Sequence, residues 1–227
     1  GGDGDDRRSQ KREREVEDAL GDPVDGREPA RAQLERHPPL ADSYRTTSIG
    51  SEYAELVARA FPSDRHRALL REMGGDSPTG GAARTALLYR APDLQARELP
   101  PFSLPHIVFP FLSQGFLRRG SHGREGLVVL NAGHWGNHHH LDSLDLYLWQ
   151  DGHELLSDLG YLWDHPDKPR TARTFAHNTV LIDGEDQRRR GRGGQFHLFA
   201  TFPRIQVMTA SSTAYAKTDE YRRTVVQ

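Results

Sequence analysis

The stretch LDLYLWQDGHELL, residues 144–156, decides the fold class of this chain. Its three leading leucines alternate with an aspartate and two aromatic residues, and alternate side chains of an extended strand face opposite sides. The pair Asp151-Gly152 follows, and an Asp-Gly pair between two such runs is a strong signal for a two-residue hairpin turn. The stretch therefore predicts two antiparallel strands joined by a tight turn.

Similar short runs continue on both sides of this hairpin, separated mainly by glycine, aspartate and histidine. Asp183-Gly184 repeats the turn signal. We therefore expect a mainly β fold, an antiparallel β-sandwich over residues 99–227 that is truncated at its C-terminus. The further strands are expected within GFLRRG (115–120), GLVVLNAG (126–133), HELLSDLG (153–160), NTVLIDG (178–184), FHLFATF (196–202) and RIQVMTA (204–210).

The part of the chain before this region has a different pattern. Residues 31–98 contain helical patterns in SEYAELVARAF, SDRHRALLREMGG and GGAARTALLYRAP, with Ser63 as a candidate N-cap. Four prolines between residues 100 and 110 end this segment, so we expect helices only before Pro100. Residues 1–30 are dense in charges of both signs and are predicted to be disordered.

Composition excludes several classes of function. The formal net charge is −2, which gives no overall basic field for nucleic acid, and there is no cysteine for disulfides or thiolate metal sites. No apolar run is long enough to span a bilayer. The sequence begins without methionine and ends inside an expected strand, so we expect a piece of a longer protein that holds only part of an active site.

A cluster of polar residues, HHHLD at 138–142, precedes the hairpin. If the segment is extended, His138, His140 and Asp142 point to one side and His139 to the other. Two imidazoles and a carboxylate on one side suit a metal site or a proton-transfer site, and they also suit a polar strand entrance. The cluster alone leaves these three interpretations open.

Two downstream stretches add to the cluster: LLSDLGYLWD (155–164) and RTARTFAHNTVLIDGEDQ (170–187). With HHHLD they resemble, in order and spacing, motifs of the heparinase II/III-like polysaccharide lyases. The resemblance covers about residues 100–227. It departs from the family pattern at the extra His139 and at SDLG, where the family more often has D-P-G or D-S-G.

The resemblance implies a metal site, most simply for Zn2+, formed by His140, Asp158 and His177 from three strands. It also implies that His138 lines a catalytic cleft, and that the helices are the end of an (α/α) toroid. The implied activity is β-elimination on an acidic, uronic-acid-containing polysaccharide, in the periplasm, at the cell envelope or outside the cell. The alternative is a non-catalytic glycan-binding or structural sandwich with a structural metal. No catalytic tyrosine and no oligomeric state is assigned.

Four arginines lie in the turn EDQRRRGRGGQ: Arg188, Arg189, Arg190 and Arg192. Guanidinium groups pair well with carboxylate or sulfate, so the turn could contact an acidic glycan. It could also be a solvated loop. No aromatic residues interleave with these arginines, which argues against single-stranded nucleic acid, and we expect no nucleic-acid partner.

Overall fold

The structure is a computed structural model and is described at residues 40, 50–75, 77–90, 104–120, 125–133, 138–162, 165–190 and 193–227. The charged segment 1–30 lies outside these residues. The elements, in order, are α3 (Ser51–Ala60), α4 (Asp64–Glu72), α5 (Gly80–Tyr89), β1 (Ile107–Phe109), the 3-10 turn η1 (Pro110–Leu112), β2 (Gln114–Arg119), β3 (Gly126–Asn131), β4 (Asp145–Gln150), β5 (His153–Leu156), α6 (Lys168–Thr171), the 3-10 turn η2 (Thr174–Ala176), β6 (Gly194–Thr201), β7 (Gln206–Ser212) and β8 (Arg222–Val226).

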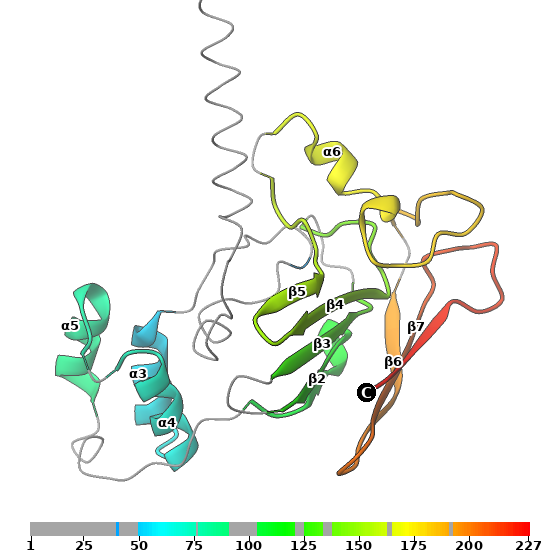
Figure 1. Cartoon of the computed structure of the whole chain (residues 1–227). Helices are drawn as coiled ribbons and strands as arrows, with labels where there is room; N and C mark the ends of the chain where they lie inside the picture. The colour runs from blue at the N-terminus through cyan, green and yellow to red at the C-terminus, as the bar shows by residue number, and fades with distance from the viewer. Residues whose placement is uncertain are drawn as a thin grey trace, which may run out of the picture.

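The helices α3, α4 and α5 group together beside the sheets (Figure 1). A small apolar core joins α3 and α4 and is formed by Ala54, Ala58 and Leu70. Ser63 caps α4 as predicted, because its hydroxyl accepts a hydrogen bond from the backbone N–H of His66 at 3.3 Å.

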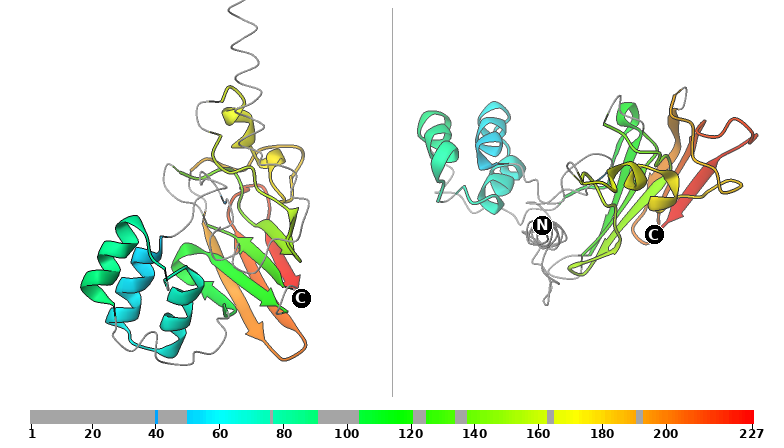
Figure 2. Two further views of the ribbon diagram at one scale, coloured as in Figure 1. Left: turned by 60° about the vertical axis from the view of Figure 1, so that its left-hand side comes forward. Right: turned by 90° about the horizontal axis from the view of Figure 1, so that it is seen from above.

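The strands form two antiparallel sheets, one of five strands in the order β1-β2-β3-β4-β5 and one of three strands in the order β6-β7-β8. The two sheets lie face to face as two layers (Figure 2). Side chains from both sheets fill the space between them, including Leu117, Leu130, Met208 and Ala210, all completely buried. The predicted antiparallel β-sandwich is confirmed.

The alternation in 144–156 places two apolar rows on opposite faces of the five-stranded sheet. Leu144, Leu146 and Leu148 belong to the core between the sheets, whereas Tyr147 and Trp149 pack on the other, outer face. Both faces are therefore covered at this strand. Burial of each large apolar side chain stabilises the fold by about 1.5–3 kcal/mol. Because a slip of one residue would exchange the two rows between the faces, their burial fixes the register of β4.

The two Asp-Gly turns form as predicted. Asp151 and Gly152 have φ values of 51° and 90°, and Asp183 and Gly184 have φ values of 54° and 71°. Positive φ at both central residues is the type I′ geometry that suits the twist of antiparallel strands.

Two expectations were wrong. Helical turns also occur after Pro100, as η1, α6 and η2. The stretch 178–184 is not a strand, and only an isolated bridge joins Ile182 to Glu185. Tertiary contacts outweigh local propensity there. The side chains of Asn178 and Thr179 donate to the carbonyls of Ser157 and Ser143, and the carbonyl of Asn178 accepts from Arg223 of β8.

Candidate metal centre

Three predicted ligand residues meet at one end of the sandwich. One donor atom from each of His140, Asp158 and His177 lies within 4.8 Å of the others, and all three residues are buried. The imidazole rings of His140 and His177 have centroids 5.2 Å apart. None of the three lies on a strand: His140 precedes β4, Asp158 follows β5, and His177 caps η2. The expectation of three strands was wrong, because loops carry the ligands.

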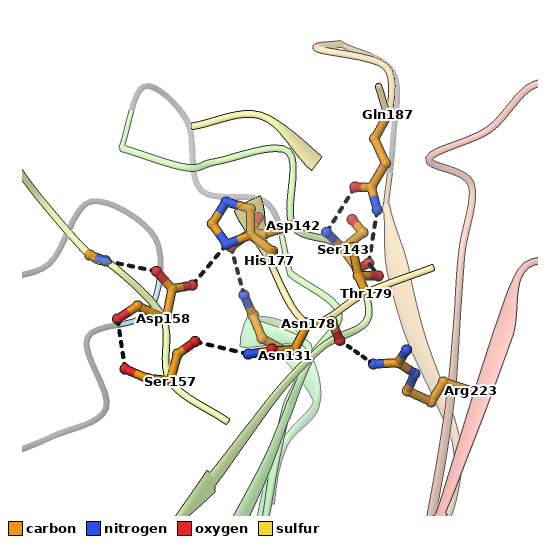
Figure 3. A network of polar contacts seen from close by, with 11 residues as sticks. Asn131, Asp142, Ser143, Ser157, Asp158, His177, Asn178, Thr179, Gln187 and Arg223 are labelled. Carbon is orange, nitrogen blue, oxygen red and sulfur yellow. Dashed lines mark hydrogen bonds and ion pairs between the residues drawn. The ribbon is translucent and has the colours of Figure 1, made fainter. Parts of the chain in front are cut away.

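Asp158 and His177 also hold each other. The Nδ1 atom of His177 lies 3.1 Å from Oδ2 of Asp158, and the side chains point toward one another (Figure 3). The other oxygen of Asp158 accepts from the backbone N–H of Gly160 at 2.8 Å. The side chain of Asn178, the residue after His177, donates to the carbonyl of Ser157 at 2.9 Å. The two loops are thus joined on both sides of the ligand pair.

The loop that carries His140 is held by the amide of Gln187. Its Oε1 accepts from the backbone N–H of Ser143 at 2.8 Å, and its Nε2 donates to the carbonyl of Ser143 at 2.9 Å. The hydroxyl of Thr179 donates to the same carbonyl at 2.8 Å. Gln187 is 2% exposed, so these bonds form away from water and their loss would leave buried backbone groups unpaired.

The second sheet adds a further contact. Arg223 of β8 donates from Nη1 to the carbonyl of Asn178 at 2.6 Å (Figure 3). It also donates to the carbonyl of Leu144 at 2.7 Å. Leu144 has a φ of 62°, a conformation that non-glycine residues rarely adopt. The three-stranded sheet therefore supplies no ligand to the group of three but holds two of its loops in place.

The site is rich in buried negative charge. Asp142 is 1% exposed, and its Oδ2 accepts from the side chain of Asn131 at 3.2 Å. Burial, and then the charge of Asp158, raise the pKa of Asp145 well above its usual value. Burial opposes protonation of His177, but the hydrogen bond and charge of Asp158 outweigh it, so the pKa of His177 is raised. The site thus attracts positive charge.

The other two histidines of the cluster differ in burial. His138 is exposed and His139 is partly buried, whereas His140 is buried. The strand expected to carry them begins only at Asp145, so strict alternation between two faces does not describe residues 138–142. The two histidines nevertheless differ in exposure. Solvent or a ligand can reach His138, whereas His140 is buried with Asp158 and His177.

The donor set fits a metal ion of zinc type. Two imidazoles and one carboxylate are ligands that zinc takes in proteins, and bonds of about 2.1 Å in a tetrahedral site put ligand atoms roughly 3.4 Å apart. The 3.1 Å between His177 and Asp158 matches such a pair.

The arginine turn is exposed at Arg188, Arg189 and Arg190, and Arg192 lies outside the described residues. Arg188 donates to the carbonyl of Thr213, so one arginine helps to hold the loop. The sequence interpretation missed the roles of Asp145 and Arg223. An aspartate within an alternating strand gives no sign of burial, and no motif marks an arginine from a distant strand.

Comparison with known proteins identifies the family. The model of the heparinase II/III-like C-terminal domain matches residues 103–226, more than half of the chain. No curated protein matches the chain in sequence.

Solved structures share the fold. A heparinase III gene product with methylated lysines superposes with a TM-score of 0.61 at 17% identity, over 86% of this chain and 28% of that one. The heparan sulfate lyase HepC from Pedobacter heparinus gives 0.58 at 16% identity, over 84% of this chain and 27% of its own. A heparinase III crystal structure gives 0.60 at 15% identity, over 83% and 28%. The chain thus spans less than a third of these proteins.

Proposed function

This chain belongs to the heparinase II/III-like family through its C-terminal region, and from that premise we propose that it is part of a polysaccharide lyase. The substrate would be an acidic polysaccharide that contains uronic acid, cleaved by β-elimination. The observation that carries the proposal is the meeting of His140, Asp158 and His177 beside an exposed His138. The helices α3–α5 would be the last part of an (α/α) toroid that completes the cleft.

The chemistry requires a base, an acid and neutralisation of a carboxylate. A base removes the proton at C5 of the uronate, the electron pair forms the C4–C5 double bond, and the C4–O4 bond breaks as O4 gains a proton. Positive or hydrogen-bonding groups at the C5 carboxylate make that proton more acidic. His138 is the residue that we assign to this work, since an imidazole can donate or accept a proton near neutral pH.

The ion would be held by His140, Asp158 and His177. Bound there, it would supply positive charge and fix the loop that carries His138. This role needs no direct contact between the ion and the sugar, and burial of all three ligands agrees with it. The residues of this chain would then do the remaining work: His138 meets the substrate, and Gln187 and Arg223 hold the loops.

A second candidate follows from the same burial. Structural zinc sites are closed and catalytic ones keep an open position, so the buried triad also suits a non-catalytic sandwich that binds glycans or packs against another domain. For the lyase and for the glycan-binding sandwich, the proposed partner is an acidic glycan. A polymer of this kind does not cross membranes, which supports a location outside the cytoplasm. No helix among the described residues has the length and apolar character to span a bilayer.

The deciding experiment is an assay of the longest natural form of the protein that contains these 227 residues. Heparan sulfate, heparin, hyaluronan and alginate would be tested for the rise in ultraviolet absorbance that an unsaturated uronate produces. A rise on one polymer supports the lyase. Binding of a polymer, measured by calorimetry, without any rise on the whole panel supports the non-catalytic alternative.

A further inference from the structure

Asp145 is a buried carboxylate that the proposed function does not use. The residue is 1% exposed, and only the backbone N–H of Asn178 and the charge of His177 favour its negative charge, whereas burial, Asp158 and Asp142 oppose it. A charged carboxylate in this situation carries a large desolvation cost unless a positive charge lies nearby. No packing role requires the charge, since a neutral side chain of the same size would fill the same volume.

Strand register places Asp145 beside the group of three ligands. It pairs with Asn131 of β3 and lies on the outer face, in the row that continues from Tyr147. Leu148 pairs with Leu156, so Asp158, two residues further along, lies next to the first residues of β4. The backbone N–H of Leu146 donates to the carbonyl of Asn178 at 3.4 Å, which brings the His177 loop to the same place.

Asp145 is near this group without belonging to it. Among the described residues, the donor atoms within 4.8 Å of one another come from His140, Asp158 and His177 alone. The carboxylate of Asp145 nevertheless feels the charges of Asp158, His177 and Asp142. Asp142 accepts a hydrogen bond from the side-chain amide of Asn131, whereas Asp145 has the backbone N–H of Asn178 as its polar neighbour.

We propose that Asp145 is a charge-balancing residue, which raises the affinity of the His140–Asp158–His177 group for a divalent cation by supplying a second buried negative charge. Two neutral imidazoles and one carboxylate give a single negative charge against the two positive charges of the ion. Asp145 supplies part of the remaining negative charge without being a ligand, and the bound ion would compensate the burial of its carboxylate more fully than Asn178 and His177 do. The inference depends on the metal site of the proposed function.

The test measures the dissociation constant for Zn2+ of the chelator-treated 227-residue chain, in competition with a chromophoric chelator. Asp145→Asn should raise the dissociation constant at least about 10-fold, as other residues behind metal ligands do. The same variant should raise the melting temperature of the metal-free chain, because it removes an uncompensated buried charge. A residue with a purely structural role would lower that temperature and leave the affinity unchanged.

Glu55→Gln is the matched control, because Glu55 is also 1% exposed but is ion-paired with Arg90. It should leave the affinity unchanged and lower the melting temperature. Asp145→Ala, which introduces no new amide, should weaken zinc binding as Asp145→Asn does.

The outcomes separate the two proposals. If the unaltered chain fails to bind zinc stoichiometrically, the metal site itself is wrong. If it binds and the Asp145 variants bind within twofold of it, the site stands and the role of Asp145 is rejected. Failure of both variants to fold would also reject it, since the side chain would then support the metal-free fold.

Discussion

In the helical segment the buried carboxylate of Glu55 meets a cation, while at the end of the sandwich the buried carboxylate of Asp145 meets other carboxylates. Both side chains are 1% exposed. Arg90 donates to Glu55 from Nε at 3.0 Å and from Nη2. The charges of Asp158 and Asp142 act against that of Asp145, and the charge of His177 only partly offsets them. The first charge is neutralised within the protein, and the second is left for something that the protein binds.

The largest expected effect, and the first test of this difference between the two regions, is the loss of bound zinc when a metal-ligating side chain is removed. His140→Ala should abolish stoichiometric zinc, because binding free energies of structural zinc sites are about 10–16 kcal/mol and each ligand carries a large share. Elemental analysis of the purified variant measures it. His139→Ala, a change at the neighbouring position, should keep the ion, and equal loss in both variants would contradict the assignment of His140.

Breaking the pair in the helical segment should be the next largest effect. Glu55→Ala removes the partner of Arg90, whose side chain is 19% exposed, and leaving one member of a buried pair costs about 3–5 kcal/mol. Urea unfolding of the helical segment, followed by circular dichroism, would show it. Zinc content should not change. If the free energy of unfolding fell by less than about 1 kcal/mol, the ion pair with Arg90 would not be what compensates the buried charge of Glu55, and the contrast with Asp145 would be lost.

His138→Ala sharpens the contrast between the exposed histidine and the buried one. If the lyase assay is positive, this variant should lower turnover by a factor of about 10² or more, as loss of a general acid–base group does. Zinc content and unfolding should stay unchanged, because the side chain is exposed. Full activity in this variant would remove His138 from the mechanism.

Gln187→Glu tests whether the buried amide of Gln187 holds the loop that carries His140. The change keeps an oxygen for the N–H of Ser143 but replaces the Nε2 donor that faces the carbonyl of Ser143. The new carboxylate oxygen would lie against that carbonyl, which Thr179 still serves, and would itself be a buried acceptor without a donor there; such a group costs about 1–3 kcal/mol, which chemical unfolding would detect. Gln195→Glu, an exposed change on β6, is the control and should cost little.

The sequence predicted some of these features and not others. The period-two runs and Asp-Gly pairs predicted the sandwich and both turns, because alternation and positive φ are local properties. The motifs named His140, Asp158 and His177, but they did not reveal that loops carry them. That placement depends on Gln187 and Arg223, which act across the fold. Asp145 was hidden for the same reason, since burial of one polar side chain is decided by its neighbours in space.

The smallest expected effect is a dependence of stability on pH in the metal-free chain. Burial and the charge of Asp158 raise the pKa of Asp145, and the contacts with Asp158 raise the pKa of His177. A group whose pKa is raised by folding binds its proton more tightly in the folded state. Its stabilisation is complete below its unfolded pKa, about 3.9 for aspartate and about 6.5 for histidine, and is lost as pH rises through the raised value.

The melting temperature of the metal-free chain should therefore fall as pH rises from about 4, at first through Asp145, and above about pH 6.5 through His177 as well. Asp145→Asn removes one of the two contributions, so its profile should be flatter, and its advantage over the unaltered chain should grow with pH. Asp219→Asn, at an exposed position, should leave the profile unchanged. Saturating zinc should reverse the trend, because the ion binds the deprotonated ligands. A profile of the metal-free chain that rises over this range, with Asp145→Asn parallel to it, would show that the carboxylates are compensated within the protein after all.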